Sequence, residues 1–248
     1  MQNRLSLLTI LIFLLISQAS CGLVSGAAAL IGTPTPQPTL TPLGNTLNFA
    51  IMSSNYETVL APGQRVPGTQ LQFVGKSDNV YTVSIDGVMG GIQDGNSFNW
   101  KGIIGPGATA DYRLKLLPTF TDTELKANGD VLITLFDPNP VESVLPQVAD
   151  TGLVYAKMPI DYVVPIGRQI PGTSLIYTGD DNGAHTFSGT ELLNRFFIGD
   201  SILWNGFLRD NIYIQNNLEL KSVEENGLQV VGTVTLRVFS APVIAAEQ

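Results

Sequence analysis

Few side chains in this sequence could carry acid–base or metal chemistry. The 248 residues include one histidine, His185, and one cysteine, Cys21. These counts exclude an internal disulfide and the Cys- and His-rich sites that bind zinc. His185 has Asp180 and Asp181 nearby, but no GxSxG elbow is present, and no pattern combines a nucleophile, a base and an orienting group. We therefore expect no catalytic residue, no cofactor and no metal.

The strongest metal candidate is the acidic segment Asp180-Asp181-Asn182-Gly183. Calcium prefers oxygen ligands, but this segment lacks the alternating Asp-x-Asp spacing and the distal Glu of an EF-hand loop. Residues 76–79, which occupy the matching place in the first copy of the repeat described below, are less acidic. We predict a plain turn here. Paired carboxylates for glycoside hydrolysis stay open as an alternative, because any two acids can meet in space, although no pair stands out.

Two tryptophans, Trp100 and Trp204, are the candidate ligand-binding residues, because exposed aromatic rings stack on sugars and other flat ligands. Each follows an apolar residue two positions earlier, Phe98 or Ile202. Residues two apart share one face of a strand. We therefore favour packing in the core over ligand binding for both tryptophans.

The tryptophans belong to a repeated sequence. Residues 59–75, VLAPGQRVPGTQLQFVG, recur at 163–179 as VVPIGRQIPGTSLIYTG, and the same offset of 104 relates Trp100 to Trp204. The shared Pro-Gly-Thr predicts a type II turn in each copy. At the Asn-Gly pairs 128–129 and 226–227 the offset is 98, which predicts a matching turn and a longer loop in the first copy. We interpret the pattern as an internal duplication.

Apolar and polar residues alternate within each copy, as at Tyr112, Leu114 and Leu116. Alternation with a period of two is typical of antiparallel strands that cover a core on one side. The sequence also has 25 Gly, 15 Pro and only 14% charged residues. We predict an all-β fold with two tandem antiparallel β-sandwich or small β-barrel units, at 46–144 and 151–245. One body shared by the two copies is the alternative.

Two segments depart from this pattern. The connection 137–152 contains three prolines and predicts a linker. Residues 188–197, SGTELLNRFF, have capping-box spacing between Ser188 and Glu191 and predict at most a turn or two of helix.

The N-terminus has the features of an export signal. Arg4 precedes an apolar run of 12 residues, 5–16, which is too short to span a bilayer as a helix. Ala19 and Ser20 come directly before Cys21. This segment resembles a bacterial lipoprotein precursor, in which the lipobox cysteine is acylated and becomes the mature N-terminus. Gln18 departs from that pattern, which usually has an aliphatic residue there.

The resemblance implies a signal peptide at 1–20 and lipid attachment at Cys21. An ordinary cleaved signal and an uncleaved anchor are the alternatives, and all three place the protein outside the cytoplasm. Residues 21–45 include four prolines interleaved with threonine, which predicts an extended tether.

The net charge of the chain indicates which classes of partner it can bind. A formal net charge of −8 argues against nucleic-acid binding. We expect a non-enzymatic lipoprotein at the cell membrane or cell surface, with the membrane as one partner and an envelope protein or glycan as another. An envelope carbohydrate hydrolase and a structural spacer are the alternative functions.

Overall fold

The described chain consists of strands, and every pairing between them is antiparallel. The computed structural model describes residues 45–52, 56–119, 123–147, 152–189 and 195–243. Within these ranges it contains 16 strands and no helix. The predicted all-β class is confirmed. None of the described residues forms a helix long and apolar enough to cross a membrane.

The described residues all belong to one compact unit, Leu43–Gln248. Cys21, the proposed signal peptide and all but the last residue of the proposed tether lie outside the described residues. The structure therefore leaves the expectations about the N-terminus as predictions.

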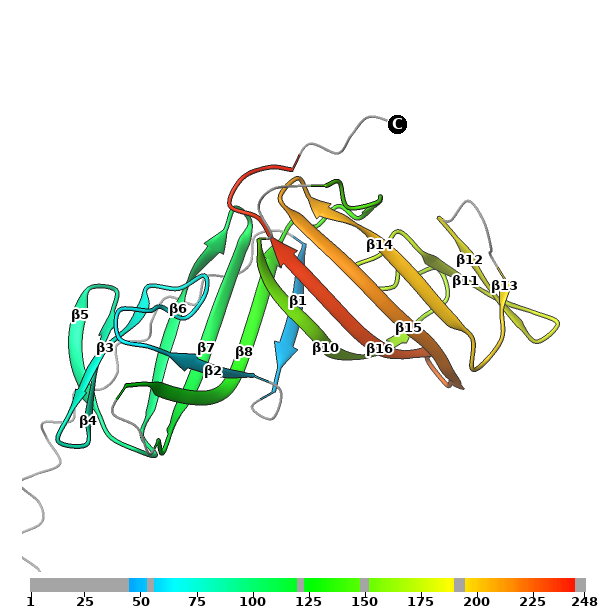
Figure 1. Cartoon of the computed structure of the whole chain (residues 1–248). Helices are drawn as coiled ribbons and strands as arrows, with labels where there is room; N and C mark the ends of the chain where they lie inside the picture. Colours follow the sequence, from blue (N-terminus) through cyan, green and yellow to red (C-terminus); the bar gives the residue numbers. More distant parts are fainter. Residues whose placement is uncertain (1–44, 53–55, 120–122, 148–151, 190–194, 244–248) are drawn as a thin grey trace, which may run out of the picture. The chain divides into compact units, whose positions relative to one another are not determined.

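The first half of the unit contains a large and a small sheet (Figure 1). The large sheet has the order β1-β8-β7-β6, and β2 also pairs with β8. Its strands are β1 (Thr46–Ile51), β2 (Glu57–Leu60), β6 (Ser97–Gly105), β7 (Ala108–Leu117) and β8 (Leu125–Phe136). The small sheet consists of β3 (Leu71–Ser77), β4 (Val80–Ile85) and β5 (Val88–Ile92).

The second half has sheets of the same sizes (Figure 1). The large sheet has the order β10-β16-β15-β14-β9. Its strands are β9 (Val141–Glu142), β10 (Leu153–Val164), β14 (Ser201–Arg209), β15 (Ile212–Glu224) and β16 (Gly227–Val238). The small sheet consists of β11 (Ile176–Asp181), β12 (Ala184–Ser188) and β13 (Arg195–Phe196).

The alternating sequence places one face of each strand in the core. In β7, Tyr112, Leu114 and Leu116 are buried, whereas Arg113 and Lys115 between them are exposed. Buried residues from all four sheets form one main hydrophobic cluster. The predicted alternation is therefore confirmed at these positions.

One predicted turn is wrong. Asn128 and Gly129 lie inside β8, whereas Glu225 and Asn226 form the turn that precedes β16. The two Asn-Gly pairs therefore do not occupy equivalent places, and the offset of 98 between them does not relate the two halves.

The pairing of β7 with β8 and of β15 with β16 shows which residues of the two halves are equivalent. Leu114 lies opposite Gly129, and Leu218 lies opposite Gly232, so the offset after this hairpin is 103. A Cβ at Gly129 would overlap the carbonyl oxygen of Arg113, and a Cβ at Gly232 would overlap that of Asn217. Gly129 thus serves a close approach of two backbones rather than a turn.

One further expectation needs correction, and another falls mainly outside the described residues. The linker predicted over 137–152 contains strand β9, whose Val141 lies opposite Phe207 of β14. In the segment predicted to be helical, Ser188 ends β12 and Arg195 begins β13. Residues 190–194 lie outside the described ranges. Strand pairing therefore overrides the linker signal at β9, whereas the short helix stays a prediction.

The two halves contact each other in a reciprocal way. Gly68, in the first copy of the repeat, lies against the side chain of Leu153 at the start of β10. Gly172, in the second copy, lies against Leu47 near the start of β1. Leu153 and Leu47 have equivalent partners, because they lie opposite Val238 and Leu135. These contacts favour one body over two independent domains.

A buried pair of tyrosines also connects the halves. The hydroxyls of Tyr112 in β7 and Tyr155 in β10 are 2.7 Å apart and hydrogen-bonded. Tyr112 also donates to the carbonyl oxygen of Pro67 at 3.3 Å, and the ring of Tyr56 packs edge-on against Tyr112. Burial is the main cause that raises the pKa of all three tyrosines above the ordinary value.

Candidate functional site

The two candidate tryptophans lie in the core. Trp100 is 4% exposed and Trp204 is 1% exposed. Their indole N–H groups donate to Asp86 Oδ1 at 3.0 Å and to Ser174 Oγ at 3.1 Å. Rings that are buried in this way have no free face on which a ligand could stack, so packing accounts for both tryptophans.

A glycine two residues after each tryptophan makes room for its ring. A Cβ at Gly102 would overlap the ring of Trp100, and a Cβ at Gly206 would lie within 2.6 Å of the ring of Trp204. The sequence pattern Trp-x-Gly is therefore a packing unit that recurs in both halves.

The acidic segment at 180–183 forms the predicted turn between β11 and β12. Asn182 and Gly183 have positive φ angles, as a two-residue hairpin turn requires. Asp180 accepts a hydrogen bond from the backbone N–H of Gly183 at 3.2 Å, and Asp181 forms an ion pair with Arg195 at 3.0 Å. No three His, Cys, Asp or Glu side chains in the described part of the chain are grouped closely enough to hold a metal ion.

His185 lies inside the small sheet of the second half. It is 3% exposed, and its Nδ1 is 3.2 Å from the hydroxyl of Tyr177. The ring of Tyr177 also packs against Phe187. The environment of His185 is thus a buried aromatic cluster, in which the imidazole is hydrogen-bonded to a phenol hydroxyl.

The repeated Pro-Gly-Thr is a turn in both halves. Gly68 and Gly172 have φ angles of +76° and +78°, as the third position of a type II turn requires. The hydroxyl of Thr69 donates to the carbonyl oxygen of Val66 at 2.9 Å and accepts from the N–H of Leu71 at 3.0 Å. Thr173 makes the equivalent bonds. The threonine therefore closes the turn, which explains why it accompanies Pro-Gly.

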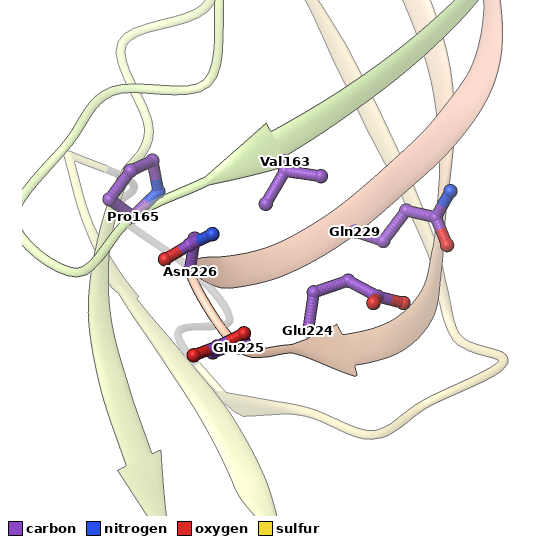
Figure 2. Close-up of a pocket in the computed structure, with 6 residues that line it drawn as sticks. All are labelled: Val163, Pro165, Glu224, Glu225, Asn226 and Gln229. Carbon is purple, nitrogen blue, oxygen red and sulfur yellow. The ribbon is translucent and has the colours of Figure 1, made fainter.

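One pocket lies at the hairpin between β15 and β16 (Figure 2). Its volume is about 590 Å³, and it is lined by Val163, Pro165, Glu224, Glu225, Asn226 and Gln229. Figure 2 shows the carboxylates of Glu224 and Glu225 pointing in different directions. Glu224 accepts a hydrogen bond from Ser222 at 2.7 Å. Glycoside hydrolysis needs two carboxyl groups that face each other across the scissile bond, and these two do not.

A second pocket, here named the junction pocket, lies where both halves meet. Its volume is about 820 Å³, within the range typical of small-molecule sites. Apolar and polar side chains both line it: Pro106, Asp137, Asn139, Val141, Glu142, Ser143, Phe207, Leu208, Arg209, Asp210, Asn211, Pro242 and Val243.

The apolar wall of the junction pocket belongs to a small hydrophobic cluster. Phe207 and Tyr213 pack edge to face with centroids 5.1 Å apart, and Phe239 completes the buried cluster. Leu145 and Val243 pack against it. This cluster is separate from the main core, and it forms because Leu145, after β8, and residues 239–243, after β16, pack against β14 and β15.

Backbone bonds hold the covering segments in place. The N–H of Asn139 donates to Leu208 O at 2.8 Å, and that of Val243 donates to Asp210 O at 2.7 Å. The side chain of Asn211, 4% exposed, donates to Pro106 O at 3.2 Å. The walls of the pocket are therefore fixed by hydrogen bonds between segments distant in sequence.

Arg209 is the cation of the junction pocket. Its Nη1 donates to the carbonyl oxygen of Phe136. Its guanidinium lies so close to Gly107 that a Cβ there would come within 2.5 Å of Nε. None of the described Asp and Glu side chains forms an ion pair with Arg209. A half-buried guanidinium with one of its five N–H groups committed still has donors to offer.

Sequence reasoning missed the junction pocket. Its lining comes from four stretches, near 106, 137–143, 207–211 and 242–243, which only the fold brings together. One signal was present: the turn Arg209-Asp210-Asn211 replaces Gly105-Pro106-Gly107 of the first copy at the offset of 104. A polar turn in one copy and a glycine turn in the other marks a difference between the halves. No family model, curated protein or solved structure matches the chain.

Proposed function

We propose that this chain is a lipid-anchored, extracytoplasmic binding protein without catalytic activity, and that it binds its ligand in the junction pocket. The junction pocket is the observation that carries the proposal. It combines an apolar wall with a few convergent polar groups, which is the usual composition of a binding site. Its walls come from both halves of the unit.

The anchor rests on the sequence alone. The single cysteine, Cys21, follows an apolar run of signal-peptide length, and acylation at this position would hold the unit at the membrane surface. Replacing Cys21 by Ser tests this part: we expect loss of lipid labelling and of membrane retention. Labelling that persists in the Cys21→Ser variant would contradict it.

A blocking variant tests binding. Val141 is 55% exposed and lines the pocket, so Val141→Trp would fill space there at little cost to the core. Val59, 50% exposed on β2 of the first half, gives the matched control Val59→Trp. The full chain and both variants are incubated with envelope extract, and the small molecules that co-purify are identified by mass spectrometry.

We expect the wild type and Val59→Trp to retain the same compounds and Val141→Trp to lose them. Retention of the same compounds by Val141→Trp would contradict binding in the junction pocket. Time-dependent breakdown of a retained glycan would instead favour the hydrolase.

A further inference from the structure

The junction pocket presents charges of both signs. Arg209 is its cation, and Asp137, Glu142 and Asp210 are its carboxylates. The three acids are exposed, whereas Arg209 is half-buried. A simple anion would enter a pocket that also presents three carboxylates, and a simple cation would leave Arg209 without a counterion.

The cation of the junction pocket is more buried than its carboxylates. Arg209 is held by the carbonyl oxygen of Phe136 and lies close to Gly107, so its guanidinium is fixed before a ligand arrives. A fixed and partly desolvated guanidinium makes strong hydrogen bonds to a carboxylate. The exposed acids suit a group that stays partly in water, such as an ammonium.

Apolar surface lies in the same pocket. Phe207, 7% exposed, is locked by its contact with Tyr213, and Val141 and Val243 add aliphatic surface. A ligand that uses all three kinds of contact carries a carboxylate, an ammonium and an aliphatic side chain.

From this combination we infer that the junction pocket binds short apolar peptides with free termini. Their carboxylate bonds to Arg209, their ammonium lies beside Glu142 and Asp210, and their side chains contact Phe207 and Val141. This inference rests on the proposed function, since it names the ligand class of the same pocket.

Three forms of one dipeptide test the inference on the full chain by calorimetry. Leucyl-valine carries both charges, its N-acetyl form only the carboxylate, and its C-terminal amide only the ammonium. We expect each blocked form to bind at least about tenfold more weakly, because each loses one charge-assisted hydrogen bond. Equal affinity of the free and N-acetyl forms, or no binding of the free dipeptide, would overturn the inference.

The variant Arg209→Gln tests whether the carboxylate of the peptide binds to Arg209. We expect this variant to weaken the free dipeptide to the affinity of the amide and to leave the affinity of the amide unchanged. A purely structural role of Arg209 would lower both affinities together and would overturn the assignment. Arg113→Gln, at an exposed arginine of β7, is the matched control and should change neither affinity.

The two proposals fail in different ways. If no dipeptide binds but another compound is retained by the wild type and lost in Val141→Trp, the pocket binds a ligand of another class and only this inference fails. If nothing is retained and no dipeptide binds, both fail.

Discussion

At two positions of this fold, Gly129 and Gly232, the residue must be glycine because a Cβ atom has no space. The backbone of β8 passes so close to β7 that Gly129 has no space for a Cβ, and Gly232 occupies the equivalent place between β16 and β15. Neither residue lies in a turn. Their role is to let neighbouring strands cross closely while the large sheets twist.

Alanine at either position should therefore destabilise the protein. We expect Gly129→Ala and Gly232→Ala each to lower the free energy of unfolding by roughly 1–3 kcal/mol, because a Cβ would press on a backbone carbonyl that cannot move freely. Gly90→Ala in β5 is the control, since a Cβ there meets no atom within 4 Å. Denaturant titration measures all three. Equal stability of Gly129→Ala and Gly90→Ala would show that the close approach is not real.

Buried tyrosine hydroxyls differ in their partners. Tyr155 bonds to Tyr112, whereas the buried hydroxyl of Tyr162 has no hydrogen-bond partner among the described residues. We expect Tyr155→Phe to cost about 1 kcal/mol, because Tyr112 keeps only its bond to Pro67. Tyr162→Phe should be neutral or stabilising, since it removes a buried polar group that is not satisfied. Equal losses in the two variants would contradict this distinction.

At the scale of elements, the short strand β9 joins the connection between the halves to the second large sheet. Its place depends on Gly206 of β14, where a Cβ would overlap the carbonyl oxygen of Val141 as well as crowd the ring of Trp204. At the equivalent Gly102 of β6, the three atoms nearest to a Cβ all belong to the ring of Trp100.

This difference gives a matched pair of variants. We expect both Gly102→Ala and Gly206→Ala to disturb the tryptophan that each glycine faces, and only Gly206→Ala to displace β9. Hydrogen–deuterium exchange over residues 139–143 should rise in Gly206→Ala and stay as in the wild type in Gly102→Ala. Unchanged exchange in both variants would show that β9 does not depend on Gly206.

The sequence predicts strands better than it predicts their connections. Alternation identifies the buried faces of β6 and β7, since burial follows directly from the period of two. It misplaces a turn at Asn128-Gly129, because the same dipeptide suits a tight turn and a close backbone crossing. It also misses β9 in a segment rich in proline. The junction pocket escapes prediction because four distant stretches form it.

At the scale of the whole molecule, burial of tyrosines links stability to pH. Burial raises the pKa of Tyr162 to about 12 from its ordinary value of 10.0, and it raises the pKa of Tyr56, Tyr112 and Tyr155 as well. The folded state holds these phenol protons more tightly than the unfolded state does. Their contribution to stability is therefore fully present below pH 10 and is lost as the pH rises from about 10 towards 12 and beyond.

We accordingly expect the melting temperature to fall steeply above about pH 10. Tyrosinate absorbance should appear together with the loss of β-sheet circular dichroism, because the buried phenols ionise only when the protein opens. The chain unfolded in denaturant is the control, and its tyrosines should titrate near pH 10. Tyrosinate absorbance that reaches half its full value near pH 10 with an intact β-sheet signal would contradict the burial of these groups.

The junction pocket exists only if the two halves act as one body, and equilibrium unfolding tests this claim most directly. Trp100→Phe leaves Trp204 to report on the second half, and Trp204→Phe leaves Trp100 to report on the first. In each variant, tryptophan fluorescence and far-ultraviolet circular dichroism are followed through one denaturant titration. We predict that the two signals change together in a single transition in both variants. Circular dichroism that changes in two steps, with fluorescence following only one of them, would show that the halves unfold independently and would contradict the account.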